Sequence, residues 1–213
     1  MCGRVTLTTP DVQEVARLVE ASVTPEDAAL YRPRYNAAPT DRHWIVQPSS
    51  HGRLLLPAVW GVPGRSGLVI NVRSETAERR FKEAFERRRV VVPADGFFEW
   101  TGPRDARRPI WFRPRAGGLL YLAGLAETLP DGRLAFTVLT TEAAGEVARI
   151  HDRMPVLLPR EKVQAWLEKP DTGLLVPTDL LRGTEVSPRV NDVKNDDPSV
   201  LEPPSVPSQL KLI

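Results

Sequence analysis

The residue best suited to chemistry is Cys2, the chain's single cysteine, which directly follows Met1. Removal of Met1, by methionine aminopeptidase or by self-cleavage, would leave an α-amine and a thiol on the same residue. These groups titrate near ~8 and ~8.5, so both are partly nucleophilic at neutral pH. Together they can capture an aldehyde as an imine and then as a thiazolidine ring, or attack an amide. From its position alone, Cys2 could equally well be a residue without a function on a frayed chain end.

A second candidate is Glu99, a carboxylate placed between Phe98 and Trp100. Side chains alternate along a strand, so Glu99 is expected to face away from both aromatic residues. A solvent-exposed carboxylate is the more common result of such a pattern. If Glu99 instead faces a closed pocket, desolvation raises its pKa and suits it to general acid–base catalysis.

The segment His151-Asp152-Arg153-Met154-Pro155 is a polar cluster that leads into an apolar run. An imidazole titrates near neutral pH, and an arginine two residues further on can hold a phosphate. The pair is therefore a candidate for proton transfer and phosphate binding. A lone histidine is more often structural, and that interpretation stays open on these residues alone.

Two further segments offer groups that could contact phosphate. The ordered loop expected at residues 31–40 contains Arg34, Asn36 and Thr40. The arginine run at 87–89 ends an expected helix, where basic side chains also complement the helix dipole. For the loop, satisfied polar side chains are an equally good interpretation, and for the arginine run a solvated helix end is the more common one.

The composition, 41% hydrophobic and 26% charged with a net charge of +2, is typical of a globular protein. A single cysteine excludes an internal disulfide framework and favours a reducing compartment. Three histidines without a CxxC pair argue against a zinc site, and no stretch approaches the ~20 apolar residues of a membrane span. Signal-peptide, phosphate-loop, dinucleotide-glycine and HExxH patterns are missing, so we expect a cytoplasmic protein without metal or cofactor.

The elements that must position these residues are expected to be short. Helices are expected from Thr9-Pro10 to about residue 19, over 74–89 with Ser74 as cap, from Thr141 to about 150, and over 160–167. Residues 61–67 are expected to form a turn or a short hairpin. Strands are expected at 43–46, 54–60, 68–71, 90–93, 97–100, 109–112, 119–126, 134–140, 156–158 and 183–190.

Many short strands with a few helices predict a single α+β domain with a mostly antiparallel, barrel-like β-sheet core and a few flanking helices. We expect this domain to span residues 1–195. The chain beyond Asn191 is rich in proline, aspartate and serine, and residues 196–213 are expected to form an irregular C-terminal tail.

Several motifs together resemble the SOS-response-associated peptidase (SRAP) family, also called abasic-site processing proteins. They follow the family's order and span nearly the whole chain, so the set is far more specific than any single tetrapeptide. The motifs are Met1-Cys2-Gly3-Arg4, YNAAP at 35–39, Trp60-Gly61, NVRSET at 71–76, VPADGFFEW at 92–100, IHDRMP at 150–155 and SPRVN at 187–191.

The resemblance implies an enzyme of the DNA damage (SOS) response that acts on abasic sites in single-stranded DNA. In the family, the processed N-terminal cysteine attacks the ring-opened sugar aldehyde and forms a stable thiazolidine DNA–protein crosslink that shields the lesion. The peptidase name records an inferred self-cleavage that exposes Cys2, and an associated lyase activity is a further expectation. We expect a monomer, cytoplasmic and nucleoid-associated when bound to DNA.

The same motifs imply the roles of individual residues. Cys2 supplies the amine and the thiol, and Asn71 holds the amine or a sugar hydroxyl by hydrogen bonds. Glu99 is the general acid–base for ring opening and imine formation, and His151 assists proton transfer and crosslink reversal. Contacts to DNA, dominated by phosphate, are implied for Arg4, Asn36, Arg73, Thr140, Arg153, Met154 and Pro155.

One segment departs from the family pattern. Relatives usually carry a longer loop after Trp60-Gly61, with a second tryptophan that wedges between bases. Here the loop at 62–67 is short and has no aromatic residue. We expect either a weaker preference for junctions between single and double strands, or a substitute wedge such as Arg65.

Two other functions remain as alternatives. Class II glutamine amidotransferases also begin Met-Cys-Gly, but their later asparagine–glycine and glutamine-binding motifs do not occur in this chain. A non-covalent single-strand binding module, with Cys2 as a bystander, would release abasic DNA fully at high salt.

Overall fold

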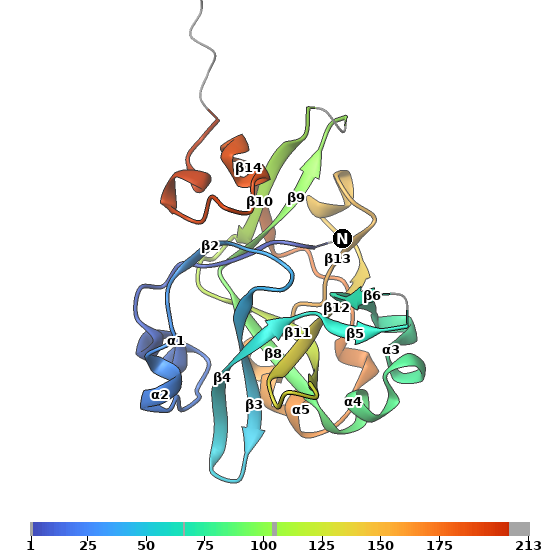
Figure 1. Cartoon of the computed structure of the whole chain (residues 1–213). Helices are drawn as coiled ribbons and strands as arrows, with labels where there is room; N and C mark the ends of the chain where they lie inside the picture. The colour runs from blue at the N-terminus through green and yellow to red at the C-terminus, as the bar shows by residue number, and fades with distance from the viewer. Residues whose placement is uncertain (1, 66, 104–105, 205–213) are drawn as a thin grey trace, which may run out of the picture.

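The computed structural model of the 213-residue chain describes residues 2–65, 67–103 and 106–204. Met1, Ser66 of the expected 61–67 turn and residues 205–213 of the expected tail lie outside the described residues. Figure 1 shows strands at the centre of the molecule and helices around them. The predicted fold class, a single α+β domain with a barrel-like core, is confirmed.

The centre is a ring of strands. Hydrogen-bonded neighbours follow the order β11-β8-β3-β4-β12, and β12 pairs again with β11, which closes the ring. These pairings are antiparallel except that of β4 with β12. The ring therefore has the mostly antiparallel character that was predicted. Its strands are β3 (Arg42–Ser49), β4 (Gly52–Trp60), β8 (Arg89–Ala94), β11 (Leu120–Thr128) and β12 (Leu134–Glu142).

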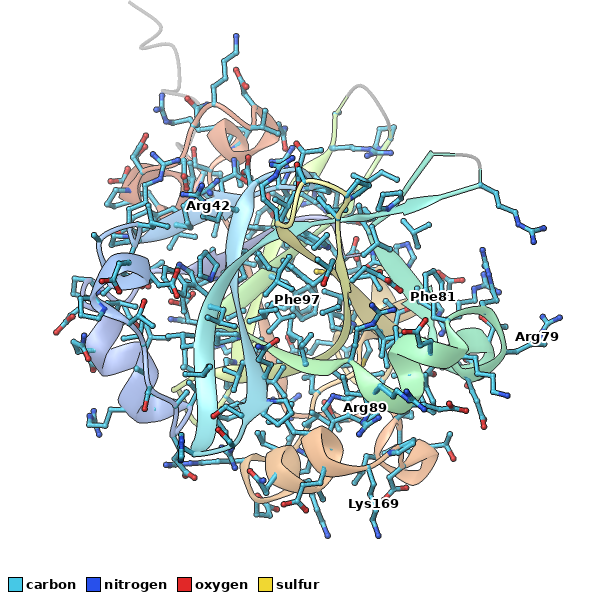
Figure 2. All side chains as sticks on the ribbon, turned by 60° about the horizontal axis from the view of Figure 1, so that its bottom comes forward. Arg42, Arg79, Phe81, Arg89, Phe97 and Lys169 are labelled. Carbon is cyan, nitrogen blue, oxygen red and sulfur yellow. The ribbon has the colours of Figure 1, made fainter. Side chains whose placement is uncertain are left out.

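Alternation along the ring strands produces two apolar cores. Val90 and Val92 of β8 face an inner core, whereas Val91 between them faces an outer core. The inner core also contains Cys2 and Phe97, and Figure 2 shows Phe97 near the middle of the molecule. Burial of an aliphatic or aromatic side chain contributes ~1.5–3 kcal/mol, so the two cores together hold the ring in shape.

A second sheet lies at one end of the ring and carries the start of the chain (Figure 1). Its strands, in order, are β14 (Leu181–Glu185), β10 (Arg108–Pro114), β9 (Gly96–Thr101), β1 (Val5–Leu7) and β2 (Arg34–Ala37). β1 pairs with β9 in a register that sets Val5 opposite Phe97. The first residues of the chain are therefore held against the strand that carries Glu99.

Two short strands extend from β12. β7 (Asn71–Arg73) pairs with it in parallel, and β13 (Arg153–Pro155) pairs with it antiparallel. Thr140 of β12 is the partner of residues in both strands. The Asn71 motif and the His151 motif, which are far apart in the sequence, therefore lie on either side of one strand.

Helices cover the outer core. They are α1 (Val12–Leu18), α2 (Pro25–Ala28), α3 (Ser74–Arg80), α4 (Lys82–Arg87) and α5 (Val163–Glu168). Phe85 of α4 packs edge-on against Trp166 of α5, with ring centroids 5.9 Å apart. Buried Arg89 donates hydrogen bonds to the carbonyls of Phe85, Trp166 and Leu167. This member of the 87–89 run therefore caps helix ends and is neither a phosphate-binding edge nor solvated. Among the described residues, no helix has the length and apolar character needed to cross a membrane.

The first helix starts later than expected. Asp11, rather than Thr9, is its N-cap, because the Asp11 carboxylate accepts a hydrogen bond of 2.9 Å from the Gln13 amide. Both residue types are good caps, and the aspartate lies two residues closer to the apolar positions that face the core.

The helix expected over 74–89 is divided into α3 and α4. Phe81, at φ −129° and ψ 44°, leaves the helical region and separates them. Arg73 rather than Ser74 is the N-cap residue of α3, and it makes no side-chain capping bond. Phe85 is buried and Phe81 half-buried against the outer core.

Three other expectations are wrong for a shared reason: partner strands from distant parts of the chain decide the outcome. Residues 31–40, expected as a loop, contain β2. The helix expected at 141–150 is replaced by the end of β12, where Thr141 pairs with Met154, followed by only a 3-10 turn at Val147–Arg149. The strand expected at 156–158 lies three residues earlier, as β13, and Leu157 forms only an isolated bridge to Leu122.

The last strand ends at Glu185 instead of continuing to 190. From residue 186 to 204 the chain forms what we call the C-terminal strap, with 3-10 helices at Pro188–Asn191 and Pro198–Leu201. Asp196 accepts hydrogen bonds from the amides of Tyr35 and Asn36, at 2.7 and 2.8 Å, and Val200 is fully buried. Residues 196–204, assigned above to the tail, thus pack against β2. The domain limit at 195 stays a prediction.

Candidate active site

Cys2 lies at the entrance of the ring, three residues before β1, and is fully buried in the inner core. The Asn71 side-chain amide donates a 2.6 Å hydrogen bond to the Cys2 carbonyl, and the Cys2 thiol lies 3.8 Å from the Arg4 carbonyl. A residue held by its neighbours in this way is not on a frayed end. The structure therefore excludes the interpretation of Cys2 as part of a disordered terminus.

The surroundings of Cys2 oppose ionisation of its thiol. Burial raises the pKa of the Cys2 thiol far above its ordinary value, and the negative charge of Glu99 raises it further. The thiol is therefore neutral at physiological pH in the described structure. Because the thiolate is the reactive form, Cys2 must gain either a cationic neighbour or solvent contact before it acts as a strong nucleophile.

Glu99 faces inward on β9 and is only 4% exposed. Phe97 on the same face belongs to the inner core with Cys2, whereas Phe98 and Trp100 pack on the C-terminal strap. Burial raises the pKa of Glu99, while nearby His151 lowers it and Asp152 raises it. The structure therefore selects the buried alternative for this carboxylate, whose raised pKa favours the protonated form.

His151 follows the 3-10 turn at Val147–Arg149 and is partly exposed. Its Nδ1 accepts a 2.9 Å hydrogen bond from the Arg153 amide, and an Asp152 carboxylate oxygen lies 2.8 Å from the same nitrogen. When Nδ1 accepts this bond, Nε2 carries the ring proton. His151 lowers the pKa of Glu99, so the imidazole lies near the carboxyl.

Asn71 presents a second polar atom to the site. Its side-chain Oδ1 is buried and has no hydrogen-bond partner among the described residues. A buried acceptor without a partner is costly, so this oxygen is suited to receive a donor from a ligand or from an amine. In the structure Asn71 holds the Cys2 carbonyl, and its expected contact with the amine or a sugar hydroxyl stays a prediction.

A hollow of about 500 Å³, here called the entrance hollow, opens beside Cys2. Arg4 reaches from its wall to the Asn36 side chain and the Val190 carbonyl, at 2.8 and 2.9 Å, and its guanidinium lies over the Trp100 ring at 5.6 Å. Burial lowers the pKa of Arg4, and the charges of nearby Asp41 and Asp192 raise it. The lining residues are Gly3, Arg4, Trp100, Ala106, Arg107, Pro188 and Asn191.

A second hollow, of about 440 Å³, is formed by Arg73, Glu142, Ala143, Asp152 and Arg153. Arg73 is exposed there, as a phosphate contact requires. Arg153 is only 7% exposed and donates to both carboxylate oxygens of Glu75, at 2.6 and 2.8 Å, and to the Thr140 carbonyl at 2.6 Å. This pairing lowers the pKa of Glu75 to about 2, so Arg153 could grip a phosphate only by exchanging its carboxylate partner.

Four of the residues implied to contact DNA are buried in the described structure, and their contact with DNA stays a prediction. The Asn36 amide is fully buried and donates to the carbonyls of Val190, Asp192 and Asn195, so it anchors the C-terminal strap. The other three line the β12–β13 pairing: Thr140 and Met154 are fully buried, and Pro155 is buried beside them. In the described structure these residues pack within the fold rather than on its surface.

Sequence reasoning missed some residues of the site. Trp100 was considered only as a flank of Glu99, yet it forms a wall of the entrance hollow and donates to Asn191 at 2.7 Å. Its position immediately after Glu99 was the available signal, since successive residues of a strand face opposite sides. Glu75 stood within a recognised motif, but nothing local indicated its pairing with Arg153. Among the described residues, no three His, Cys, Asp or Glu side chains gather as a metal site would require.

Comparison with known proteins extends over nearly the whole chain. Three similar proteins carry the name abasic site processing protein. YoqW of Bacillus subtilis is 31% identical over 95% of this chain and 99% of its own length, and YedK of Escherichia coli is 29% identical over 80% and 84%. HMCES of Gallus gallus is 28% identical over 85% and 70%.

Solved structures agree on the fold. A Bacteroides thetaiotaomicron protein superposes with a TM-score of 0.79 at 19% identity, covering 96% of this chain and all of that one. A phage-related protein of Bordetella bronchiseptica gives a TM-score of 0.69 at 28% identity, covering 87% and 94%. The family model described as SOS response associated peptidase (SRAP) matches residues 1–193. The chain therefore belongs to the SRAP family.

Proposed function

We propose that this protein recognises abasic sites in single-stranded DNA and traps them covalently through Cys2 after Met1 has been removed. Relatives named abasic site processing proteins support an abasic-site role. The observation that carries the covalent proposal is the placement of Cys2: its backbone is fixed by Asn71 and its thiol is buried beside Glu99. The protein acts in the cytoplasm, on the nucleoid, as a monomer.

The chemistry proceeds in two steps. The freed Cys2 amine adds to the aldehyde carbon of the ring-opened sugar, and loss of one water gives an imine. The thiol then adds across the carbon–nitrogen double bond: sulfur bonds to carbon, and the thiol proton ends on nitrogen. The product is a thiazolidine that joins protein and DNA. An imine that does not close permits strand cleavage by elimination, so a lyase activity belongs to the same proposal.

Glu99 and His151 divide the proton transfers. Glu99, whose pKa is raised by burial, supplies the proton that allows hydroxyl to leave as water. It then accepts a proton when the thiol attacks. His151, with Nε2 able to carry the ring proton, exchanges protons between Glu99 and solvent and assists reversal. Asn71 orients the amine in two ways. Its side-chain amide donates to the Cys2 carbonyl, and its unpartnered oxygen accepts a hydrogen bond from the amine.

Phosphate binding keeps the lesion in place. Arg4, which lines the entrance hollow, and Arg73, which is exposed in the second hollow, supply the positive charge for this binding. Arg153 joins them by releasing Glu75. Such contacts recognise no sequence, as a lesion sensor requires.

The test is a denaturing gel with abasic single-stranded DNA and three proteins. The wild type is expected to give a heat-stable adduct, and Cys2→Ala is expected to give none. Cys2→Ser keeps the amine and loses the thiol, so its imine is expected to appear only after reduction with borohydride. A heat-stable adduct in Cys2→Ala would refute the proposal. Ammonia release from glutamine by the wild type would instead indicate an amidohydrolase.

A further inference from the structure

A third hollow, which we call the arginine groove, lies outside the site described above. It has a volume of about 810 Å³ and lies between the end of α3 and the hairpin of β5 (Val62–Gly64) and β6 (Gly67–Val69). The hairpin confirms the expected turn at 61–67. The groove is lined by Pro63, Gly64, Arg65, Val69, Arg79, Arg80 and Phe81.

The charge of the groove is available for binding. Arg65, Arg79 and Arg80 are exposed, and within the described residues they take part in none of the ion pairs. Some exposed arginines elsewhere are paired, such as Arg133 with Asp131 and Arg160 with Glu20. Figure 2 shows Arg79 directed away from the body of the molecule. Three arginines around one hollow attract a ligand with several negative charges.

The floor of the groove is apolar. Val69 and Phe81 are half-buried and pack on the outer core, and Leu68 on the adjoining hairpin is 47% exposed. A ligand that suits the groove therefore combines regularly spaced anions with flat or apolar faces. A nucleic-acid strand has both, with phosphates for the arginines and sugars and bases for the floor.

The groove is continuous in the chain with the candidate active site. β6 ends at Val69, two residues before Asn71, and α3 begins directly after β7. Arg73 at the end of β7 lines the hollow beside His151, and Arg79 follows at the far end of α3. At ~1.5 Å per residue, these two arginines are separated by roughly 9 Å along the helix, the length of a few phosphates of one strand.

We infer that the arginine groove binds the phosphate backbone of one DNA flank of the abasic site, so that the strand leaves Cys2, passes Arg73 and continues along α3. This inference rests on the proposed function. Basic residues in the last turn of a helix also complement its dipole, and Arg17 does so at the end of α1, another helix of seven residues. Arg17 lines none of the three hollows, which makes it a matched control.

The experiment measures equilibrium binding to single strands that carry a tetrahydrofuran abasic analogue, which has no aldehyde and cannot crosslink. The flanks on the two sides are lengthened separately. For the wild type, lengthening one flank is expected to tighten binding. Arg79→Gln/Arg80→Gln is expected to lose that gain and to bind on the order of 10-fold more weakly at 0.1 M salt. The salt slope, which is the slope of the logarithm of the binding constant against the logarithm of the salt concentration, is expected to be smaller in magnitude by about 1.4. That is ~0.7 for each lost phosphate contact.

The control pair is Arg17→Gln/Lys169→Gln, which removes the same charge far from the groove; Lys169 lies on another side of the molecule from Arg79 (Figure 2). It is expected to bind as the wild type does. Arg65→Gln on the hairpin is an independent variant, expected to lower the slope by about 0.7, and it serves if the double variant does not fold.

Equal salt slopes for wild type and groove variants would overturn the inference. So would equal competition by polyglutamate of the same charge, which would indicate an acidic protein partner. Because the probe cannot crosslink, a failed crosslinking assay with aldehyde-bearing DNA would refute the proposed function and leave this result standing.

Discussion

At the scale of single residues, the surroundings of Cys2 suggest why the site requires processing. A thiol without charge lies beside Glu99, whose pKa is raised by burial, so the thiol is not in its nucleophilic thiolate form. A freed α-ammonium beside them would lower both pKa values through its positive charge. Removal of Met1 would therefore supply the reacting amine on Cys2 itself.

Replacement of Glu99 by glutamine tests the acid–base role. The amide keeps the size of the side chain and can neither give nor take a proton, so we expect crosslink formation to slow by roughly 10²- to 10⁴-fold. Glu168→Gln, on an exposed position of α5, is the control and should react at the wild-type rate. Rates of adduct formation measured from pH 5 to 9 provide the comparison. A Glu99→Gln rate equal to the wild type would remove Glu99 from the mechanism.

His43 predicts how stability depends on pH. Burial lowers its pKa to about 4, its Nε2 donates to the Pro93 carbonyl at 2.8 Å, and in the unfolded chain the pKa is ~6.5. The unfolded state therefore binds more protons between these values. The stabilising contribution is complete above pH 6.5 and is lost as the pH falls to about 4, by on the order of 3 kcal/mol.

His43→Gln keeps a donor toward Pro93 and does not titrate. The difference in free energy of unfolding between wild type and His43→Gln should therefore shrink from pH 7 to pH 4. Urea denaturation at several pH values measures it. A difference that stays constant over this range would show that His43 is not the titrating group.

At the scale of elements, the C-terminal strap and β2 form the floor beneath Arg4. Asn36 connects them, since its oxygen accepts from Arg4 and its amide donates to three carbonyls of the strap. Arg34 of β2 adds an ion pair to Asp196. The wall of the entrance hollow therefore depends on residues that no ligand touches.

Asn36→Ala is expected to destabilise the protein, because it removes the donor to the Asp192 and Asn195 carbonyls and one of the two acceptors of the Arg4 guanidinium. A loss of roughly 3 kcal/mol, with a Tm lower by about 6–12 °C, is the expected size. Asn195→Ala removes one hydrogen bond, to the Arg189 carbonyl, and should change stability by less than ~1 kcal/mol. Thermal unfolding of both variants decides the matter, and equal Tm values would contradict the anchoring role of Asn36.

The short β5–β6 hairpin carries the prediction about DNA junctions. It has no aromatic wedge, and Arg65 is its exposed candidate for that task. We expect this protein to bind gapped or forked DNA only slightly better than plain single strands. If Arg65 acts as the wedge, Arg65→Ala should abolish the remaining preference. A junction preference that survives Arg65→Ala would exclude Arg65 as the wedge.

At the scale of the whole molecule, local patterns predicted those features that depend on neighbours in the sequence. The hairpin, the buried strand β8 and the inward–outward alternation around Glu99 are of this kind. The motif order also identified the family. Features that depend on distant partners were not predictable: the extension of β12 to Glu142 needs β13, and β2 needs β1.

The same division applies to the candidate site. Cys2 is linked to Asn71 by a hydrogen bond and to Glu99 by charge, and Glu99 to His151 by charge, while four residues implied to contact DNA, among them Asn36, are buried. Residue type indicated that an amide or a threonine could meet DNA. Only packing decides whether such a side chain faces solvent, and packing is set by the ring as a whole.

Intact mass spectrometry of the purified protein, before and after incubation with an abasic oligonucleotide, tests the central claim most directly. The account predicts a starting mass that lacks one methionine residue, then a gain equal to the oligonucleotide mass less one water. A protein that keeps Met1, or that lacks Met1 and gains no oligonucleotide mass, would contradict it.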